Sequence, residues 1–281
     1  MSNRPTVDFG EKTDVGKVRA GNEDSCKVYR PDECPDGIDG LLVVADGMGG
    51  HAAGDVASQL VVDTFKQRFI QSQLEDMRER LIDALEYANI AIFHKVKAQP
   101  ELSGMGTTLI ALVYDGLSIQ WLSVGDSPIW LVRKDELQRL NENHSMSEVL
   151  AEKVAAGQMS EEEARTSPIR SQLLEAVMGE NIDRVDAPHH AIALCEGDCL
   201  LLASDGVETC PGETILALVQ QHKDNTEMLT TALLNAVSAI ERPKQDNATV
   251  IVMQVNKTDI EEPTTVQPET SDPVEEPSTV Q

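Results

Sequence analysis

The chain has 281 residues, of which 41% are hydrophobic but only 3% aromatic, so it can build a sizeable core mainly from aliphatic side chains and Met. Its formal net charge of −25 argues against nucleic acid or an anionic membrane surface as a partner, because both attract basic proteins. No segment has the pattern of a signal peptide or a transmembrane helix, and the five cysteines show no C-x-x-C spacing. These features predict free thiols in a reducing cytoplasm and, by default, a monomer.

The N-terminal region alternates β-prone pieces with glycine. Short β-prone pieces within residues 6–9 and 13–25 predict two antiparallel strands that lead into the next apolar run. A polar cluster, Asn22-Glu23-Asp24, follows shortly after Arg19. The cluster is either a solvated turn or the place where an arginine clamps an anion beside carboxylates.

The strongest local signal is the stretch from Gly40 to His51. Its apolar residues 41–45 form an uninterrupted run, which predicts a strand buried on both faces. Asp46-Gly47 ends this run and begins a glycine-rich turn. A carboxylate at the rim of a sheet is a natural metal ligand, but Asp-Gly is also an ordinary turn. The choice depends on whether the chain supplies matching carboxylates.

Two helices and a β-rich block follow. Residues 52–69 and 74–96 repeat apolar side chains every three to four positions, which predicts two amphipathic helices lying on a sheet. Residues 106–114, 117–124 and 129–133 predict three strands of an antiparallel meander. Asp126 then lies at the end of the second of these strands.

Residues 141–176 differ in character from the strands around them. A short amphipathic helix begins after Ser145 and ends at Gly157, and Ser160 opens a second helix with a capping box. The excursion lies outside the predicted sheets. It is either a functional flap or a plain surface insertion.

The last third of the chain supplies two more strand-end aspartates. Residues 191–195 and 199–204 predict a hairpin that delivers Asp205-Gly206. Asp246-Asn247 directly precedes a predicted strand at 248–255. Helices are predicted between them at 212–221 and 226–240.

The composition changes at residue 257. Residues 257–281 carry a net charge of −6, contain four prolines and have few apolar side chains, which predicts a disordered tail. The tail holds an imperfect repeat, 261–267 against 275–281. Docking, phosphorylation and simple solubilisation are all open for this repeat.

Four aspartates, Asp46, Asp126, Asp205 and Asp246, thus lie at ends of apolar strands that could meet at one edge. Neighbouring carboxylates raise one another's pKa unless a cation compensates them. Oxygen-only ligation favours Mg²⁺ or Mn²⁺ over zinc. A pair of such ions about 3.5–4 Å apart would generate hydroxide and clamp a phosphoryl group, which suits hydrolysis of phosphate monoesters.

Six motifs in register narrow this interpretation: TDVGKVRAGNEDS, LLVVADGMGGHAAG, GMGTTL, VGDSP, LLLASDGV and DNATVIV. Together they resemble the metal-dependent Ser/Thr protein phosphatases (the PPM family, type 2C), particularly the compact bacterial branch. The resemblance covers roughly residues 6–255. It implies an α+β fold, a four-layer α-β-β-α sandwich of two antiparallel sheets flanked by helices. The catalytic domain would span 1–256, with a small helical flap at about 145–170.

The resemblance also implies a set of metal ligands. Asp46 would bridge two Mn²⁺ or Mg²⁺ ions, and Gly47 would offer its backbone carbonyl to one of them. Asp205 and Asp246 would complete the other ion's shell. Asp126, together with Asp205, matches the position that binds a third, looser ion in bacterial members.

The resemblance also implies roles for residues that support the metal ligands. Glu23 and Asp24 would hold metal-bound waters, and Asn247 would orient water behind them. Arg19 would grip the phosphoryl oxygens of the substrate. The flap at 145–170 would lie beside the cleft and affect the choice of substrate.

The implied mechanism is direct attack on phosphorus by a hydroxide that bridges the metals, with no phosphoenzyme. In the eukaryotic branch a histidine directly after Asp-Gly is the presumed general acid, whereas this chain has Met48 there. His51, three residues further on, or a metal-bound water could deliver the proton. Pro128 and the stretch 174–179 also depart from the family pattern, without touching a metal ligand.

The sequence therefore predicts a protein-serine/threonine phosphatase that acts on phosphorylated Ser/Thr proteins and reverses a cognate bacterial Ser/Thr kinase. The alternatives are a pseudophosphatase that docks a kinase or phosphoprotein without turnover, and a protein that binds cations only structurally. Degenerate family members lose metal aspartates, and this chain retains all of them.

Overall fold

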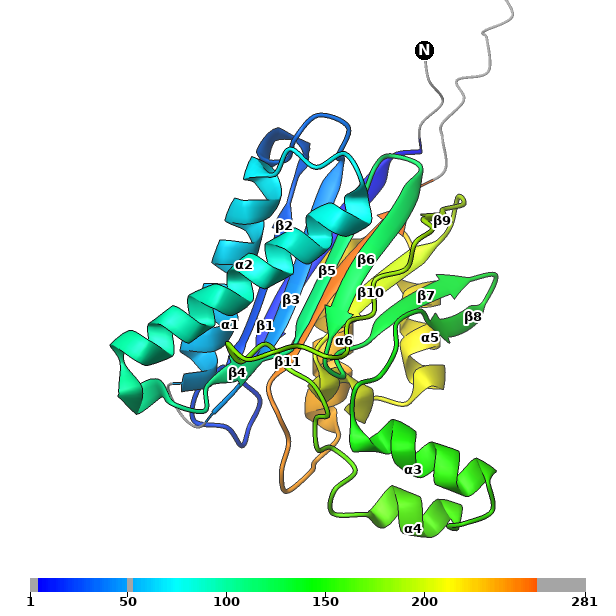
Figure 1. Ribbon diagram of the computed structural model, residues 1–281. Coiled ribbons are helices and arrows are strands. Elements are labelled where there is room, and N and C mark those ends of the chain that lie inside the picture. Colours follow the sequence, from blue (N-terminus) through cyan, green and yellow to red (C-terminus); the bar gives the residue numbers. More distant parts are fainter. Residues whose placement is uncertain (1–4, 50–52, 257–281) are drawn as a thin grey trace, which may run out of the picture.

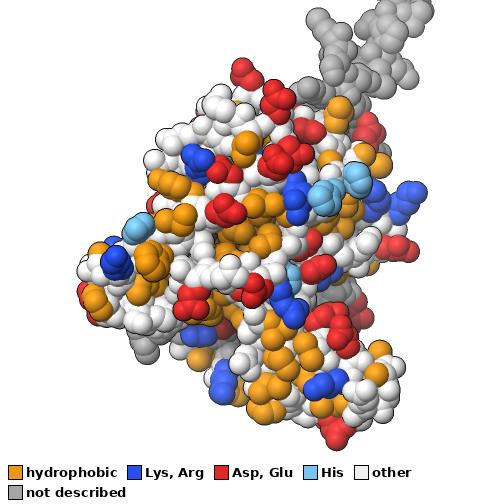
Figure 2. Space-filling view, viewed as in Figure 1, with side chains coloured by type: hydrophobic (Ala, Val, Ile, Leu, Met, Phe, Trp, Pro, Cys, Tyr) orange, Lys and Arg blue, Asp and Glu red, His pale blue; other side chains and the backbone are white. Residues whose placement is uncertain are grey.

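Two antiparallel sheets packed face to face form the centre of the computed structural model, which describes residues 5–49 and 53–256 (Figure 1). Helices cover the outer face of each sheet, which confirms the predicted four-layer α-β-β-α sandwich. His51 and the predicted tail at 257–281 lie outside the described residues. Acidic side chains are spread over the face shown in Figure 2, as the net charge leads one to expect.

The first sheet has the strand order β2-β3-β5-β6-β9, with β4 paired to the end of β3. Its strands are β2 (Asp24–Tyr29), β3 (Gly40–Met48), β4 (Gly106–Thr107), β5 (Leu109–Tyr114), β6 (Ser118–Val124) and β9 (Ile192–Ala193). The helices α1 (Ala53–Gln71) and α2 (Met77–Ala98) pack on its outer face, where the helical periodicity predicts them.

The second sheet has the order β1-β11-β10-β7-β8. Its strands are β1 (Val7–Asp14), β11 (Ala248–Val255), β10 (Cys199–Ala203), β7 (Ile129–Arg133) and β8 (Glu136–Arg139). It is covered by α5 (Gly212–Gln221) and α6 (Thr226–Ala239). Single 3₁₀ turns lie at Pro31–Glu33, Pro100–Leu102 and Asp205–Thr209.

The apolar run of β3 is buried on both faces, as predicted. Leu41, Val43 and Ala45 pack toward α1 and α2, whereas Leu42 and Val44 face the second sheet. All five side chains have 0% exposure. Burying a Leu or Val fully contributes about 1.5–3 kcal/mol, so this strand fixes its own position firmly and with it the position of Asp46.

The predicted meander at 106–133 is wrong in its last strand. β5 and β6 pair as expected, but β7 belongs to the other sheet and pairs with β10. The chain crosses between the sheets at Gly125, whose φ of 103° favours glycine. The Ile129 N–H then donates to Asn141 Oδ1 at 2.8 Å instead of to a strand of the first sheet.

The predicted hairpin at 191–204 is also wrong. β9 pairs with β6 in the first sheet, whereas β10 lies in the second. The buried Asp198 directs this crossing, because it accepts from the Cys195 N–H at 2.7 Å and pairs with Arg133 at 2.6 Å. The first two strands of the chain are divided in the same way, since β1 pairs with β11 and β2 with β3.

The excursion after β8 carries α3 (Met146–Ala155) and α4 (Glu161–Thr166) outside both sheets (Figure 1). Ser145 caps α3, and Ser160 caps α4 with the predicted capping box. Among the described residues, no helix combines the length and the apolar character needed to cross a membrane.

Candidate metal centre

A cavity of about 400 Å³ opens at the end of the sandwich where β3 finishes and β11 begins. Seven of the predicted site residues line it: Arg19, Glu23, Asp46, Gly47, Asp126, Asp205 and Asp246. They come from segments up to 227 residues apart, joined by the Arg19–Asp246 contact. Asp24 and Asn247 do not line this cavity, although they lie next to residues that do.

Hydrogen bonds hold the backbone of Asp46 at both its N–H and its carbonyl group. Its N–H donates to Thr108 Oγ1 at 3.0 Å, and its carbonyl accepts from the Thr107 hydroxyl at 2.9 Å and from the Thr108 N–H at 2.9 Å. Burial raises the pKa of Asp46 well above its usual value, and the charges of Asp24, Asp205 and others raise it further. A cation at this carboxylate would relieve both effects.

Gly47 has no room for a side chain. A Cβ at this position would lie 2.1 Å from the carbonyl oxygen of Gly54 and 2.4 Å from that of Glu23. The Gly47 N–H donates to the Glu23 carbonyl at 3.1 Å. The glycine after Asp46 therefore lets the start of α1 and the Glu23 loop close around the backbone beside the cavity.

The second Asp-Gly pair packs in the same manner. Asp205 follows β10 and begins a 3₁₀ turn, and a Cβ on Gly206 would lie 1.9 Å from the carbonyl oxygen of Asn247. Burial, followed by the charges of Asp126 and Asp246, raises the pKa of Asp205 to about 8. The close backbone contact brings Asp205 beside Asp246, which precedes β11.

Arg19 is the cation of this cavity. Its Nη2 donates to Asp246 Oδ2 at 2.6 Å, and its Nη1 lies 3.8 Å from Glu23 Oε2. The hydrogen bond that Arg19 donates to Asp246 raises the pKa of Arg19 despite partial burial. The side chain remains 46% exposed, so its remaining N–H groups are available to an incoming anion.

Asn247 holds a distant loop by hydrogen bonds, a role that the sequence did not predict. Its Nδ2 donates to the carbonyls of Val15 at 2.9 Å and Gly21 at 3.0 Å, and its Oδ1 accepts from the Glu23 N–H at 2.9 Å. These three bonds pin the loop that carries Arg19 and Glu23. Both N–H donors of the amide are thereby used, and no local pattern around residue 247 indicates such distant partners.

Asp24 is buried and joins the two sheets at the site. It pairs in register with Asp46 and accepts from the Ser204 hydroxyl at 2.8 Å, and Ser204 Oγ in turn accepts from the Thr249 N–H at 3.0 Å. Burial raises the pKa of Asp24 to about 6, although its hydrogen bonds oppose this. The structure thus places Asp24 behind the cavity, against the strand that carries Asp46.

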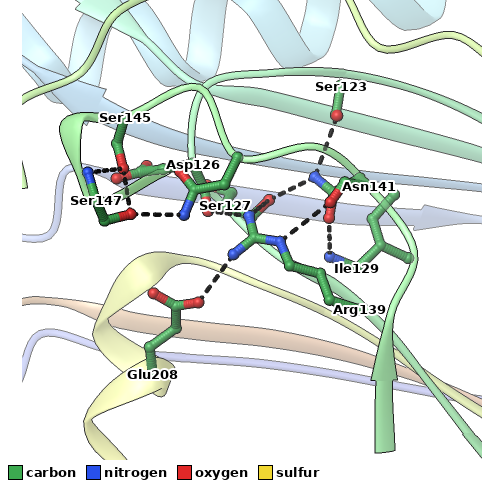
Figure 3. A network of polar contacts seen from close by, with 10 residues as sticks. Ser123, Asp126, Ser127, Ile129, Arg139, Asn141, Ser145, Ser147 and Glu208 are labelled. Atoms are coloured by element: carbon green, nitrogen blue, oxygen red, sulfur yellow. Dashed lines mark hydrogen bonds and ion pairs between the residues drawn. The ribbon is translucent and has the colours of Figure 1, made fainter. Parts of the chain in front are cut away.

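Asp126 belongs to a polar network at the crossing between the sheets (Figure 3). Arg139 donates to the Asp126 carbonyl oxygen at 2.6 Å and pairs with Glu208 at 3.0 Å. Asn141 donates to Ser123 Oγ at 3.1 Å in the same network. Burial raises the pKa of Asp126 to about 6, and the charge of Glu208 adds to the effect. Arg139 holds this loop, and no local sequence pattern predicts that role.

The donor set fits a divalent cation. Within residues 5–49 and 53–256, no three Asp, Glu, His or Cys side chains are gathered closely enough to hold one ion as they stand. The carboxylates nevertheless share one cavity, and burial, together with the charges of nearby carboxylates, raises the pKa of Asp46, Asp126 and Asp205. Hard oxygen donors with unmet negative charge are what Mg²⁺ and Mn²⁺ bind.

The raised pKa of Asp205 predicts a stability that depends on pH. An acid whose pKa is higher in the folded than in the unfolded protein destabilises the fold as pH rises from the unfolded value, near 4, to the folded value, about 8. In the presence of a chelator, the free energy of unfolding of the wild-type protein is therefore expected to fall between pH 6 and pH 8. That of Asp205→Asn is expected to fall less. Urea unfolding midpoints at both pH values test this, and parallel shifts in the two proteins would contradict it.

Comparisons with known proteins agree with this geometry. A family model described as Protein phosphatase 2C matches residues 20–245. The serine/threonine protein phosphatase PstP of Mycobacterium tuberculosis is 35% identical over 248 residues, which cover 88% of this chain and 45% of that protein. The chain thus spans less than half of that relative's length.

Two further matches cover nearly all of the matched chain, which in the second case is a catalytic domain alone. The serine/threonine phosphatase stp of Listeria innocua is 30% identical over 250 residues, 87% of this chain and 94% of that protein. The crystal structure of the catalytic domain of PstP in complex with two manganese ions superimposes with a TM-score of 0.72 and 32% identity, covering 89% of this chain and 99% of the other. The family model matches most of the chain, and the Listeria relative is 30% identical over nearly its whole length, so the chain belongs to the protein phosphatase 2C family.

Proposed function

We propose that this protein is a metal-dependent protein-serine/threonine phosphatase that hydrolyses phosphoserine and phosphothreonine in proteins. One observation carries the proposal: Asp46, Asp205, Asp246 and Glu23 converge with Arg19 in one open cavity. Relatives named as serine/threonine phosphatases, and the manganese complex of one of them, support it.

The metal-holding residues in this proposal are Asp46, the Gly47 carbonyl, Asp205 and Asp246. Glu23, which lines the cavity, and the buried Asp24 would act through water, and Asp126 with Asp205 would hold a third ion. Bound Mn²⁺ or Mg²⁺ supplies charge compensation, Lewis acidity toward the phosphoryl group and a lower pKa for water.

Arg19 is the residue of the chain that would hold the phosphoryl group. Its guanidinium carries several N–H donors in a planar fork, which suits a phosphate, and it already meets a carboxylate inside the cavity. Asn247 would keep Arg19 in reach by pinning its loop at Val15 and Gly21. These residues bind and orient the substrate, while the acidic residues attract the cations.

The leaving alkoxide needs a proton, and Met48, which lines the cavity, cannot supply one. His51 is the proposed acid. Replacing it by alanine, His51→Ala, is expected to remove one ionisation from the pH profile of kcat and to lower kcat by about 10²-fold with natural phosphopeptides. Aryl phosphates, whose leaving groups are already acidic, should be affected less. An unchanged pH profile would show that another group, such as water, donates the proton.

The direct test of the function is hydrolysis of an aryl phosphate and of a phosphothreonine peptide, with Mn²⁺ and with a chelator. Wild type is expected to turn over both substrates only with Mn²⁺, and Asp205→Asn to require a higher Mn²⁺ concentration or to lose activity. Absence of metal-dependent turnover by the wild type would favour a pseudophosphatase that binds phosphoproteins without hydrolysis.

The remaining expectations are part of the same proposal. The catalytic domain comprises residues 1–256, the α3–α4 excursion acts as a flap beside the cavity, and 257–281 is an acidic tail. The protein acts in the cytoplasm as a monomer and opposes a Ser/Thr kinase. The net charge of −25 makes nucleic acid and anionic membranes unsuitable partners.

A further inference from the structure

A second cavity of about 370 Å³ adjoins the first. The two share four lining residues, Asp126, Ser171, Asp205 and Asp246, so a wall of carboxylates is common to both. An extended ligand that occupies the first cavity can therefore continue into the second. The flap contributes to the second cavity from one side and the loop before β11 from the other.

Three cations line this second cavity: Arg170 at the end of the flap, and Arg242 and Lys244 in the loop between α6 and β11. All three are exposed. Within the described residues, their side chains form no hydrogen bond and no ion pair within 4.0 Å. Three unpaired cations on one cavity are unusual in a protein with a net charge of −25, although four carboxylates, Asp126, Asp205, Glu208 and Asp246, line the same cavity.

Two of the four acidic residues of the same cavity are already paired with arginines. Glu208 pairs with Arg139 at 3.0 Å, and Asp246 with Arg19 at 2.6 Å. Asp126 and Asp205 belong to the proposed metal set. The charge of Arg170 also acts on Glu208, whose pKa it lowers, so the two cations that these carboxylates do not require are Arg242 and Lys244.

The facing wall offers neutral donors. The hydroxyls of Ser145 and Ser147 lie 2.8 Å apart at the first turn of α3, and Figure 3 shows them beside Asp126 and Glu208. The N-terminus of this ten-residue helix directs its positive end toward the same space. The helix end adds to the three cations and would not form a site without them.

We infer that the second cavity is a subsite for an anionic side chain of the substrate, close in sequence to the phosphorylated residue that enters the first cavity. The inference rests on the proposed phosphatase function. The preferred substrates are then segments that carry a second negative group, and Arg242 and Lys244 recognise that group. A second phosphoryl group and a carboxylate share the chemistry that these cations bind.

The test uses the full chain with Mn²⁺ and three sets of phosphothreonine peptides. One set has neutral flanks, one has a Glu at each position from −3 to +3 in turn, and one has a phosphoserine there. The measured quantity is the ratio of kcat/KM for each charged peptide to that for the neutral peptide. Wild type is expected to prefer a charged peptide at one or two positions by about tenfold, and 0.5 M salt should reduce that preference. Comparing the Glu and phosphoserine sets identifies which anion is preferred.

The Arg242→Ser/Lys244→Ser protein is expected to lose this preference, with the ratio falling to about one. Both side chains are exposed and form no hydrogen bond in the described structure, so the fold should tolerate the change. The matched control, Arg184→Ser/Lys223→Ser, removes the same charge at residues that line neither cavity and should keep the preference. Equal ratios in wild type and the double variant would overturn the inference. Failure to hydrolyse any peptide would instead contradict the proposed function.

A binding measurement separates recognition from turnover. Fluorescence anisotropy of a labelled charged peptide, whose phosphothreonine is replaced by a non-hydrolysable phosphonate, gives its Kd. The double variant is expected to bind this peptide about tenfold more weakly than wild type and the neutral peptide equally well. An equal loss of affinity for both peptides would also overturn the inference, because it would indicate a general electrostatic effect.

Discussion

Asp46→Asn is expected to lower phosphatase activity by about 10³-fold or more, and at the same time to make the metal-free protein more stable. The activity falls because Asp46 is the proposed bridge between two ions and an amide cannot supply its charge. The stability rises because burial and neighbouring aspartates raise the pKa of Asp46, which means that its ionised form destabilises the folded protein. We expect a gain of about 1 kcal/mol in the free energy of unfolding.

Activity is measured with a phosphothreonine peptide at saturating Mn²⁺, and stability by urea unfolding in the presence of a chelator. Asp115→Asn is the matched control. Asp115 follows β5 at the end of the sheet away from Asp46 and accepts from the Leu117 N–H at 2.9 Å and the Ser118 N–H at 2.7 Å. The control should therefore lose some stability and keep its activity. An Asp46→Asn protein with activity within tenfold of wild type would remove Asp46 from the proposed metal set.

Gly47→Ala is expected to destabilise the protein by about 3 kcal/mol and to abolish activity in the fraction that folds. The added methyl group would lie 2.1 Å from the Gly54 carbonyl oxygen and 2.4 Å from that of Glu23, so backbone atoms must move apart. That movement displaces Glu23, the beginning of α1 and the Gly47 carbonyl together. Thermal and urea unfolding, followed by Mn²⁺ titration of activity, measure the two effects.

Gly21→Ala provides the comparison on the same wall of the cavity. A Cβ there meets no atom within 4 Å, and Gly21 has no positive φ. The free energy of unfolding of Gly21→Ala should therefore stay within about 0.5 kcal/mol of the wild-type value. If Gly47→Ala were as stable as Gly21→Ala, the close approach of the backbone at Gly47 would not be a requirement of the fold.

The candidate site was predictable where its residues directly follow a local apolar run. Asp46 and Asp205 each terminate such a run, and Asp246 precedes one, so periodicity alone located three of the carboxylates at strand ends. The six motifs in register then related these ends to a single site. The structure brings all three to one cavity, as that relation implies.

Sheet membership was not predictable in the same way. In a sandwich, two consecutive strands with the same alternation can lie side by side or face each other, and both arrangements bury the same residues. The crossings after β6 and β9 are decided by contacts of Gly125, Asn141 and Asp198. These contacts join positions up to 65 residues apart, such as Arg133 and Asp198, and no short window of sequence contains them.

The supporting residues were harder to predict for the same reason. Asn247 was expected to orient water, but its three hydrogen bonds to Val15, Gly21 and Glu23, more than 220 residues earlier, were not predicted. Arg139 has no feature in its own sequence context that marks it as the clamp of the Asp126 loop. Such roles arise from the folded arrangement and become visible only there.

The pairing of β1 with β11 has a consequence for how the protein is made. Val7 lies opposite Val255, and Asn247 holds the loop that carries Arg19. Among the described strands β1 pairs only with β11, so it has no partner strand until β11 exists. The ribosome must add at least 224 further residues before Asn247 can hold the N-terminal loop. Such distant pairing slows folding, since the long intervening loop has to be closed first. A nascent chain therefore carries an unfinished cavity until β11 has been made.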